Sequence, residues 1–199
     1  MTIKSLSDNS DADLLNTVQL TMIPLELKKD EITGEVIGYK EKQDKSLTTR
    51  GGNIELNVGD FIRLEITNKG KEAVYVSILD LRSDGKVGPA FPNTNSTDIN
   101  KNLIPADGKP HVANLFKITE PLGMESFRAI VTKTPTDFTP LIDPELIRTG
   151  SRGGERGENA AKTPLGRILI NAQAGKRSES VMLPASWATE TLNFFIVPK

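Results

Sequence analysis

The sequence contains no cysteine and only one histidine, His111, among its 199 residues. No disulfide, cysteine-ligated zinc or iron–sulfur site, or cysteine nucleophile can therefore form within the chain. A serine–histidine–aspartate triad would have to use His111, yet no Gly-x-Ser-x-Gly segment accompanies it. A zinc site would need carboxylates for its other protein ligands, which zinc disfavours. We therefore expect no catalytic residue, no metal site and no cofactor, and a structural or surface role for His111.

An excess of charge of one sign and long apolar runs are also missing. Lysine and arginine number 25 against 26 aspartates and glutamates, which gives a net charge of −1. Binding to nucleic acid or to an anionic membrane surface needs clustered basic charge, so we expect neither partner. No segment approaches the roughly 18 apolar residues of a membrane span, and the first twenty residues lack the apolar core of a signal peptide. We expect a soluble chain with no visible signal peptide, and the cytoplasm is the favoured compartment.

Aromatic residues make up 5% of the chain, and Trp187 is the single tryptophan. Paired carboxylates of a glycosidase could occur among so many acids, but the aromatic platforms usual for sugar binding are scarce. We expect Trp187 to fill the core or its rim just before the final strand. A phosphate loop is not supported either, because Ile170 stands where the Gly175-Lys176 pair would need the first glycine of the motif.

The chain does contain clear alternation of apolar and polar residues. Val18, Leu20 and Met22 alternate with polar neighbours, which is the period of a half-buried strand. The same pattern occurs twice within residues 59–81, on either side of "NKGK", and predicts a β-hairpin there. Further strands are predicted at 32–40, with a bend or bulge at its glycines, and at 87–91, 111–119, 125–133 and 189–197.

Residues 80–96, "DLRSDGKVGPAFPNTNS", are rich in turn-forming residues. Asp84-Gly85 turns the chain into "VGPAF", where Pro89 predicts an edge strand. A calcium site is the alternative, but the acidic and amide residues do not have the spacing of an EF-hand, and turn chemistry accounts for all of them. These residues are Asp80, Asp84, Asn93, Asn95 and Asp98. The candidate recognition residues on this predicted rim are Asp84, Phe91, Asn93 and Asn95.

The C-terminal third changes in character. Residues 150–162 are rich in glycine and charge and predict a mobile loop, with Arg148, Arg152 and Arg156 as candidate proteolysis sites. A helix is predicted over 164–174, where apolar residues follow a helical period and Gly175 ends the pattern. The final strand, 189–197, is nearly apolar on both faces, which places it centrally in a sheet.

Together these patterns predict a mainly β protein. We expect an antiparallel β-sandwich of about seven to nine strands, with one or two short helices near the C-terminus. Residues 1–15 are polar and acidic and predict a flexible lead-in or linker, and residues 16–199 predict a single domain.

The central block resembles the bacterial domain of unknown function 4384. The similarity extends over about residues 54–135 and is carried by strand pattern and turn residues. The motifs are Gly59-Asp60, Val74-Tyr75-Val76, Asp84-Gly85-Lys86, Phe91-Pro92-Asn93 and Glu120-Pro121-Leu122-Gly123 before "ESFRAIVT". Members of that family typically lie on the C-terminal side of caspase-like peptidase domains, and they also occur in other envelope or signalling multidomain proteins.

The resemblance implies a non-catalytic accessory domain, and it supplies no active-site residue to transfer. We expect the chain to bind or position a protein partner, such as a caspase-like peptidase domain. That peptidase could cut this chain after the basic residues of the predicted loop. The alternative is a carbohydrate, cell-wall or calcium-binding sandwich that acts through its rim loops.

Overall fold

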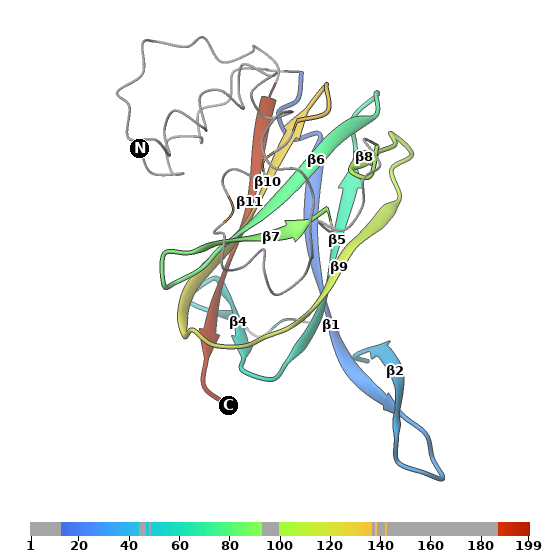
Figure 1. The fold of residues 1–199 in the computed structure, drawn as a ribbon, viewed down its shortest axis with the longest axis vertical. Coiled ribbons are helices and arrows are strands. Elements are labelled where there is room, and N and C mark those ends of the chain that lie inside the picture. Colours follow the sequence, from blue (N-terminus) through green and yellow to red (C-terminus); the bar gives the residue numbers. More distant parts are fainter. Residues whose placement is uncertain are drawn as a thin grey trace.

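The protein is a sandwich of two β-sheets, as the computed structural model shows (Figure 1). The structure describes residues 13–43, 47, 49–92, 100–136, 138, 142 and 187–199. Eleven strands and no helix lie in this part of the chain, which confirms the mainly β fold class. The predicted loop 150–162, the predicted helix 164–174 and most of the predicted lead-in 1–15 lie outside the described residues.

The first sheet has four strands in the order β2-β1-β5-β9. Their bounds are β1 Val18–Lys29, β2 Val36–Glu41, β5 Phe61–Asn68 and β9 Pro110–Lys117. The second sheet has the order β3-β4-β11-β10-β6-β7, and β8 pairs with β6 beside β7. Their bounds are β3 Thr49–Arg50, β4 Asn53–Asn57, β6 Val74–Leu81, β7 Val87–Phe91, β8 Leu103–Ile104, β10 Gly123–Thr132 and β11 Trp187–Val197.

The main core lies between the sheets and follows from the alternation in the sequence. The inward residues of β5, such as Leu64 and Ile66, have no exposed surface, and those of β6 behave alike. Leu14, within the predicted flexible lead-in, is also buried in this core, so the packed domain begins earlier than the polar composition suggests. Trp187 packs with Leu79 and Ile130 in a second cluster, which confirms its predicted core role.

The predicted hairpin over residues 59–81 is wrong. β5 belongs to the first sheet and β6 to the second, so the connection between them crosses the sandwich. The buried Asn68 organises this crossing: its Nδ2 donates to the carbonyl oxygens of Glu72 and Ile104 at 2.9 and 3.1 Å. Its Oδ1 accepts the N–H of Gly70 at 2.9 Å, and Gly70 does not adopt the positive φ that the hairpin prediction assumed.

Replacing Asn68 with alanine should lower the free energy of unfolding by about 2 kcal/mol, because buried carbonyl and amide groups lose their hydrogen-bond partner. Urea denaturation followed by circular dichroism measures the change. Asn53→Ala, at an exposed position, is the matched control and should change stability by less than about 0.5 kcal/mol. Equal losses in both variants would contradict a role for Asn68 in holding the crossing.

Four other predictions concern the strand order and pairing. The turn between β6 and β7 is a hairpin as predicted, with Gly85 at φ 83°, and β7, which contains Pro89, is an edge strand. The pairing of β2 is irregular at Gly38, which confirms the predicted bulge. β11 lies centrally as predicted, but it pairs in parallel with β4 as well as antiparallel with β10. The second sheet is therefore mixed rather than purely antiparallel.

No helix in the described part of the chain is long and apolar enough to cross a membrane.

Candidate functional site

Asp80 is the most unusual polar residue of the described structure. It lies inside β6, two residues beyond the buried Ile78, and therefore faces the space between the sheets. Its Oδ1 is buried and has no hydrogen-bond partner. The interpretation of Asp80 as a turn residue is wrong, because the turn begins only after Leu81.

A second carboxyl group lies beside Asp80. Phe127 of β10 is the register partner of Asp80, so Glu125, two residues away on β10, shares its face of the sheet. Glu125 is only 6% exposed, and its Oε1 accepts the N–H of Ser83 at 3.4 Å. Two acidic side chains therefore meet at one end of the sandwich interior.

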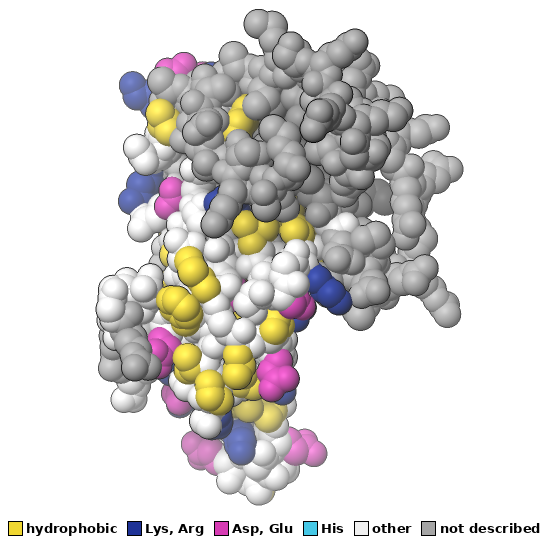
Figure 2. Space-filling view, turned by 90° about the vertical axis from the view of Figure 1, so that its left-hand side faces the viewer, with side chains coloured by type: hydrophobic (Ala, Val, Ile, Leu, Met, Phe, Trp, Pro, Cys, Tyr) yellow, Lys and Arg dark blue, Asp and Glu magenta, His cyan; other side chains and the backbone are white. Residues whose placement is uncertain are grey.

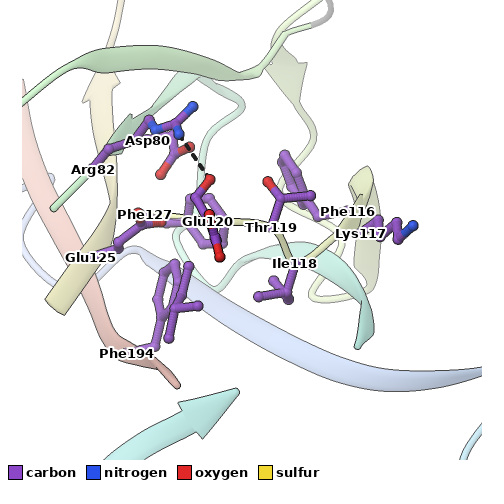
Figure 3. Close-up of a pocket in the computed structure, with 11 residues that line it drawn as sticks. Asp80, Arg82, Phe116, Lys117, Ile118, Thr119, Glu120, Glu125, Phe127 and Phe194 are labelled. Carbon is purple, nitrogen blue, oxygen red and sulfur yellow. Dashed lines mark hydrogen bonds between the residues drawn. The ribbon is translucent and has the colours of Figure 1, made fainter. Parts of the chain in front are cut away.

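The two carboxyl groups line a cavity of ≈ 110 Å³ (Figure 3). Its apolar wall is an aromatic row, in which the ring centroid of Phe127 lies 5.1 Å from that of Phe116 and 5.0 Å from that of Phe194. The connection from β9 to β10 supplies Thr119 and Glu120. The peptide bond between Glu120 and Pro121 is cis.

Arg82 lies next to the acidic pair but is engaged elsewhere. Its Nη2 donates to the carbonyl oxygen of Glu120 at 3.1 Å (Figure 3). Its Nε lies 3.7 Å from Asp84 Oδ1. Arg82 therefore ties the β6–β7 turn to the connection between β9 and β10. Asp80 receives only its longer-range attraction.

The surroundings favour the protonated form of Asp80. Burial is the main cause and raises the pKa of Asp80 to about 7, and the neighbouring charge of Glu125 adds to this, whereas Arg82 opposes it. Burial also raises the pKa of Glu125, and the hydrogen bond from the Ser83 amide opposes that change. The pair can therefore hold and release a proton near neutral pH.

The predicted rim residues are not brought together where the structure describes them. Asp84 caps the β6–β7 turn, where its Oδ1 accepts the N–H of Lys86 at 3.1 Å. Phe91 lies at the far end of β7 and is partly buried against the core. Asn93, Asn95, Arg148, Arg152 and Arg156 lie outside the described residues, so their proposed roles stay predictions.

The remaining polar candidates have ordinary surroundings. His111 is the second residue of β9, and its Nε2 lies 3.0 Å from Asp107 Oδ1 at the surface. This agrees with the structural or surface role predicted for it. Within the described ranges, no group of three or more histidine, cysteine, aspartate or glutamate side chains is placed to hold a metal ion.

β9 presents a different kind of candidate site. It is an end strand of the first sheet and, among the described residues, pairs with β5 alone. Two of its apolar side chains point outward: Val112 is 58% exposed and Leu115 is 49% exposed. Figure 2 shows a side of the molecule on which hydrophobic side chains likewise lie at the surface among charged ones.

Sequence alternation could have located the acidic pair. Asp80 continues the inward series of Val74, Val76 and Ile78, and Glu125 continues that of Phe127 and Ala129. A charged residue in phase with a buried series is a signal of a buried polar group. Their proximity could not be predicted, because it depends on which strands are neighbours.

No curated protein matches the chain. The family model described as "Domain of unknown function (DUF4384)" matches residues 55–135, from within β4 to just beyond β10. This match supports a domain of that family within the chain, over nearly the segment that the sequence resemblance indicated.

Proposed function

We propose that this chain is a non-catalytic interaction domain that binds a protein partner through β9. The observation that carries the proposal is the pair of exposed apolar side chains, Val112 and Leu115, on a strand at the end of a sheet. The outer edge of an end strand can pair with another chain, and natural proteins usually protect such edges with charged side chains. Burying these two side chains against a partner would remove apolar surface from water.

The non-catalytic role is supported by the chemistry of the chain. It has no cysteine, and its single histidine is paired with Asp107 at the surface. The acidic pair Asp80 and Glu125 borders a cavity of ≈ 110 Å³, which is smaller than the roughly 300 to 1,000 Å³ of typical ligand pockets.

The proposed partner is a caspase-like peptidase domain, whether in the same polypeptide or in a separate one. The family resemblance implies this setting, and the β-sandwich would then position the peptidase or its substrate. The peptide bonds after Arg148, Arg152 and Arg156 are proposed cleavage sites for the same peptidase. After incubation with it, mass spectrometry should find cuts at these bonds. An intact segment would remove this part of the proposal.

The binding probe in this test is a purified caspase-like peptidase domain from the organism that encodes this chain. Leu115→Lys should weaken binding by at least tenfold in isothermal titration calorimetry, because an ammonium group buried in an apolar contact loses its hydration. Tyr39→Lys, at a side chain of nearly equal exposure on a different strand, is the matched control and should bind like the wild type. Absence of wild-type binding, or equal weakening by both variants, would contradict the proposal.

The alternative ligand class is tested in parallel by thermal unfolding. Calcium or a glycan that binds only the native state must raise the melting temperature. We expect no increase with either, and a saturable increase would favour the carbohydrate or calcium-binding function instead.

A further inference from the structure

Residues 26–41 form a two-stranded arm that extends beyond the sandwich (Figure 1). β1 pairs with β5 from Val18 to Leu25 and with β2 from Leu25 to Lys29. Beyond Leu25, the arm therefore consists of the end of β1, a turn and β2, with no third described strand beside it. A two-stranded ribbon is marginally stable in water unless another element packs or pairs with it.

The arm is nevertheless well formed and has apolar surface to cover. Asp30 fixes its turn: the Oδ1 atom accepts the N–H groups of Ile32 and Thr33 at 2.9 and 2.8 Å. The side chains of Val36, Ile37 and Tyr39 are 54%, 56% and 47% exposed. The arm thus carries a strand whose outer edge and apolar side chains are both accessible.

We propose that two copies of this chain pair through their β2 strands, antiparallel, with Tyr39 facing Tyr39 of the second copy. The pairing would join the two four-stranded sheets into one continuous sheet of eight strands. It concerns a different strand from the one in the proposed function and does not depend on it.

The hydrogen-bond phase of β2 determines which alignments are possible. The N–H of Lys42 donates to the carbonyl oxygen of Pro24 at 3.0 Å, so Lys42 and, by alternation, Lys40 face β1. The N–H and C=O groups of Tyr39 and Glu41 then point away from β1. In an antiparallel pair, a residue whose backbone groups point toward the other strand lies opposite a residue of the same kind. In a symmetric dimer, one residue must therefore face its own counterpart across the two-fold axis.

The charges of β2 and its bulge together select Tyr39 for that position. Alignment on Ile37 would centre the pair on the one residue of this stretch that has no register partner on β1, where the strand is irregular. Alignment on Lys40 or on Glu41 would place like charges directly opposite each other, which destabilises a sheet. Alignment on Gly38 would place Glu35 opposite Glu41 of the second copy. Alignment on Tyr39 places Lys40 opposite Gly38 and Glu41 opposite Ile37, with no like charges facing.

The position of Tyr39 also suits a symmetric contact. Its ring lies 5.3 Å from that of Phe61 at an interplanar angle of 47°, and its register partner on β1 is Leu27. These neighbours limit the directions in which the phenol ring can point. Two such rings meeting across the axis would form an aromatic cross-strand pair, a stabilising contact in sheets.

The test replaces Tyr39 with charges of each sign. In sedimentation velocity over a range of concentrations, the wild type should dimerise, whereas Tyr39→Lys and Tyr39→Glu should each be monomeric. An equimolar mixture of these two variants should form a heterodimer, because the residue on the axis faces only its own counterpart. Leu115→Lys and Leu115→Glu on β9 are matched controls that should dimerise like the wild type.

The absence of cysteine gives an independent readout. Tyr39→Cys should be converted to a covalent dimer by a short bismaleimide, and Leu115→Cys, at nearly equal exposure, should not. Unchanged circular dichroism in each variant establishes that the sandwich is intact. A wild type that stays monomeric at the highest concentration, or a mixture of charge variants that stays monomeric, would overturn the proposal.

Discussion

Asp80→Asn is expected to raise the free energy of unfolding at pH 8 by about 2 to 4 kcal/mol and to leave it nearly unchanged at pH 4. The carboxyl oxygen is buried without a partner, and its pKa is raised from 3.8 to about 7. That interval corresponds to an upper limit of roughly 4 kcal/mol, at 1.36 kcal/mol for each pH unit. Asparagine keeps the shape of the side chain and removes its ionisation.

The direction follows from proton binding. Between about pH 4 and pH 7, the folded protein holds a proton on Asp80 that the unfolded chain has released. The free energy of unfolding of the wild type therefore falls as the pH rises through this window, and the raised pKa of Glu125 adds in the same direction. Urea denaturation at pH 4, 6 and 8 measures it, with Glu31→Gln, in the exposed turn between β1 and β2, as the control. Parallel pH curves for the wild type and Asp80→Asn would contradict the expectation.

Phe127→Ala should lower the free energy of unfolding by about 3 to 5 kcal/mol, the usual cost of removing a buried aromatic side chain. The Phe127 side chain is 2% exposed and lies between the rings of Phe116 and Phe194. It also forms part of the cavity wall beside Asp80, so its removal enlarges an existing space. Phe195 lies on the face of β11 opposite to Phe194 and is only partly buried, so Phe195→Ala should lower the free energy of unfolding much less.

The same variant offers a second measurement. Water that enters the enlarged space would reach the Asp80 carboxyl group and bring its pKa back toward the ordinary value. The decrease in stability between pH 4 and pH 8 should then be smaller in Phe127→Ala than in the wild type. A stability loss equal to that of Phe195→Ala, or an unchanged pH dependence, would show that the aromatic row does not keep the acidic pair dry.

The alternating residues predicted most strands correctly, because half-buried strands impose a period of two on the sequence. The strand beginning at Val18, the two strands joined by residues 69–73 and the final strand are all present. Pro89 correctly indicated an edge strand, since a residue without an N–H is poorly placed inside a sheet. These features depend on a few neighbouring residues, which the sequence displays directly.

Pairing between strands was harder to predict. Asn-Lys-Gly is compatible both with a hairpin and with a crossing between sheets, and the choice depends on Ile104, which accepts a hydrogen bond from Asn68 over a separation of 36 residues. The parallel pairing of β4 with β11 joins segments still further apart. Neither relationship has a local signature.

The acidic pair was missed for another reason. Aspartate is common in turns, and the nearby Asp84-Gly85 turn made that interpretation of Asp80 attractive. The in-phase position after Ile78 was the better guide. The predicted rim residues Asp84 and Phe91 were chosen for turn chemistry alone, and β7 separates them.

The central place of β11 has a consequence for how the protein is made. Ribosomes deliver the chain from its N-terminus, so β4 and β10 leave the exit tunnel long before the strand that separates them. Until Trp187–Val197 emerges, the nascent sheet has a gap bordered by two unsatisfied backbones. A strand translated well after both of its neighbours is thus the one that closes the sheet, and the stretch matched by the family model cannot complete the sheet unaided.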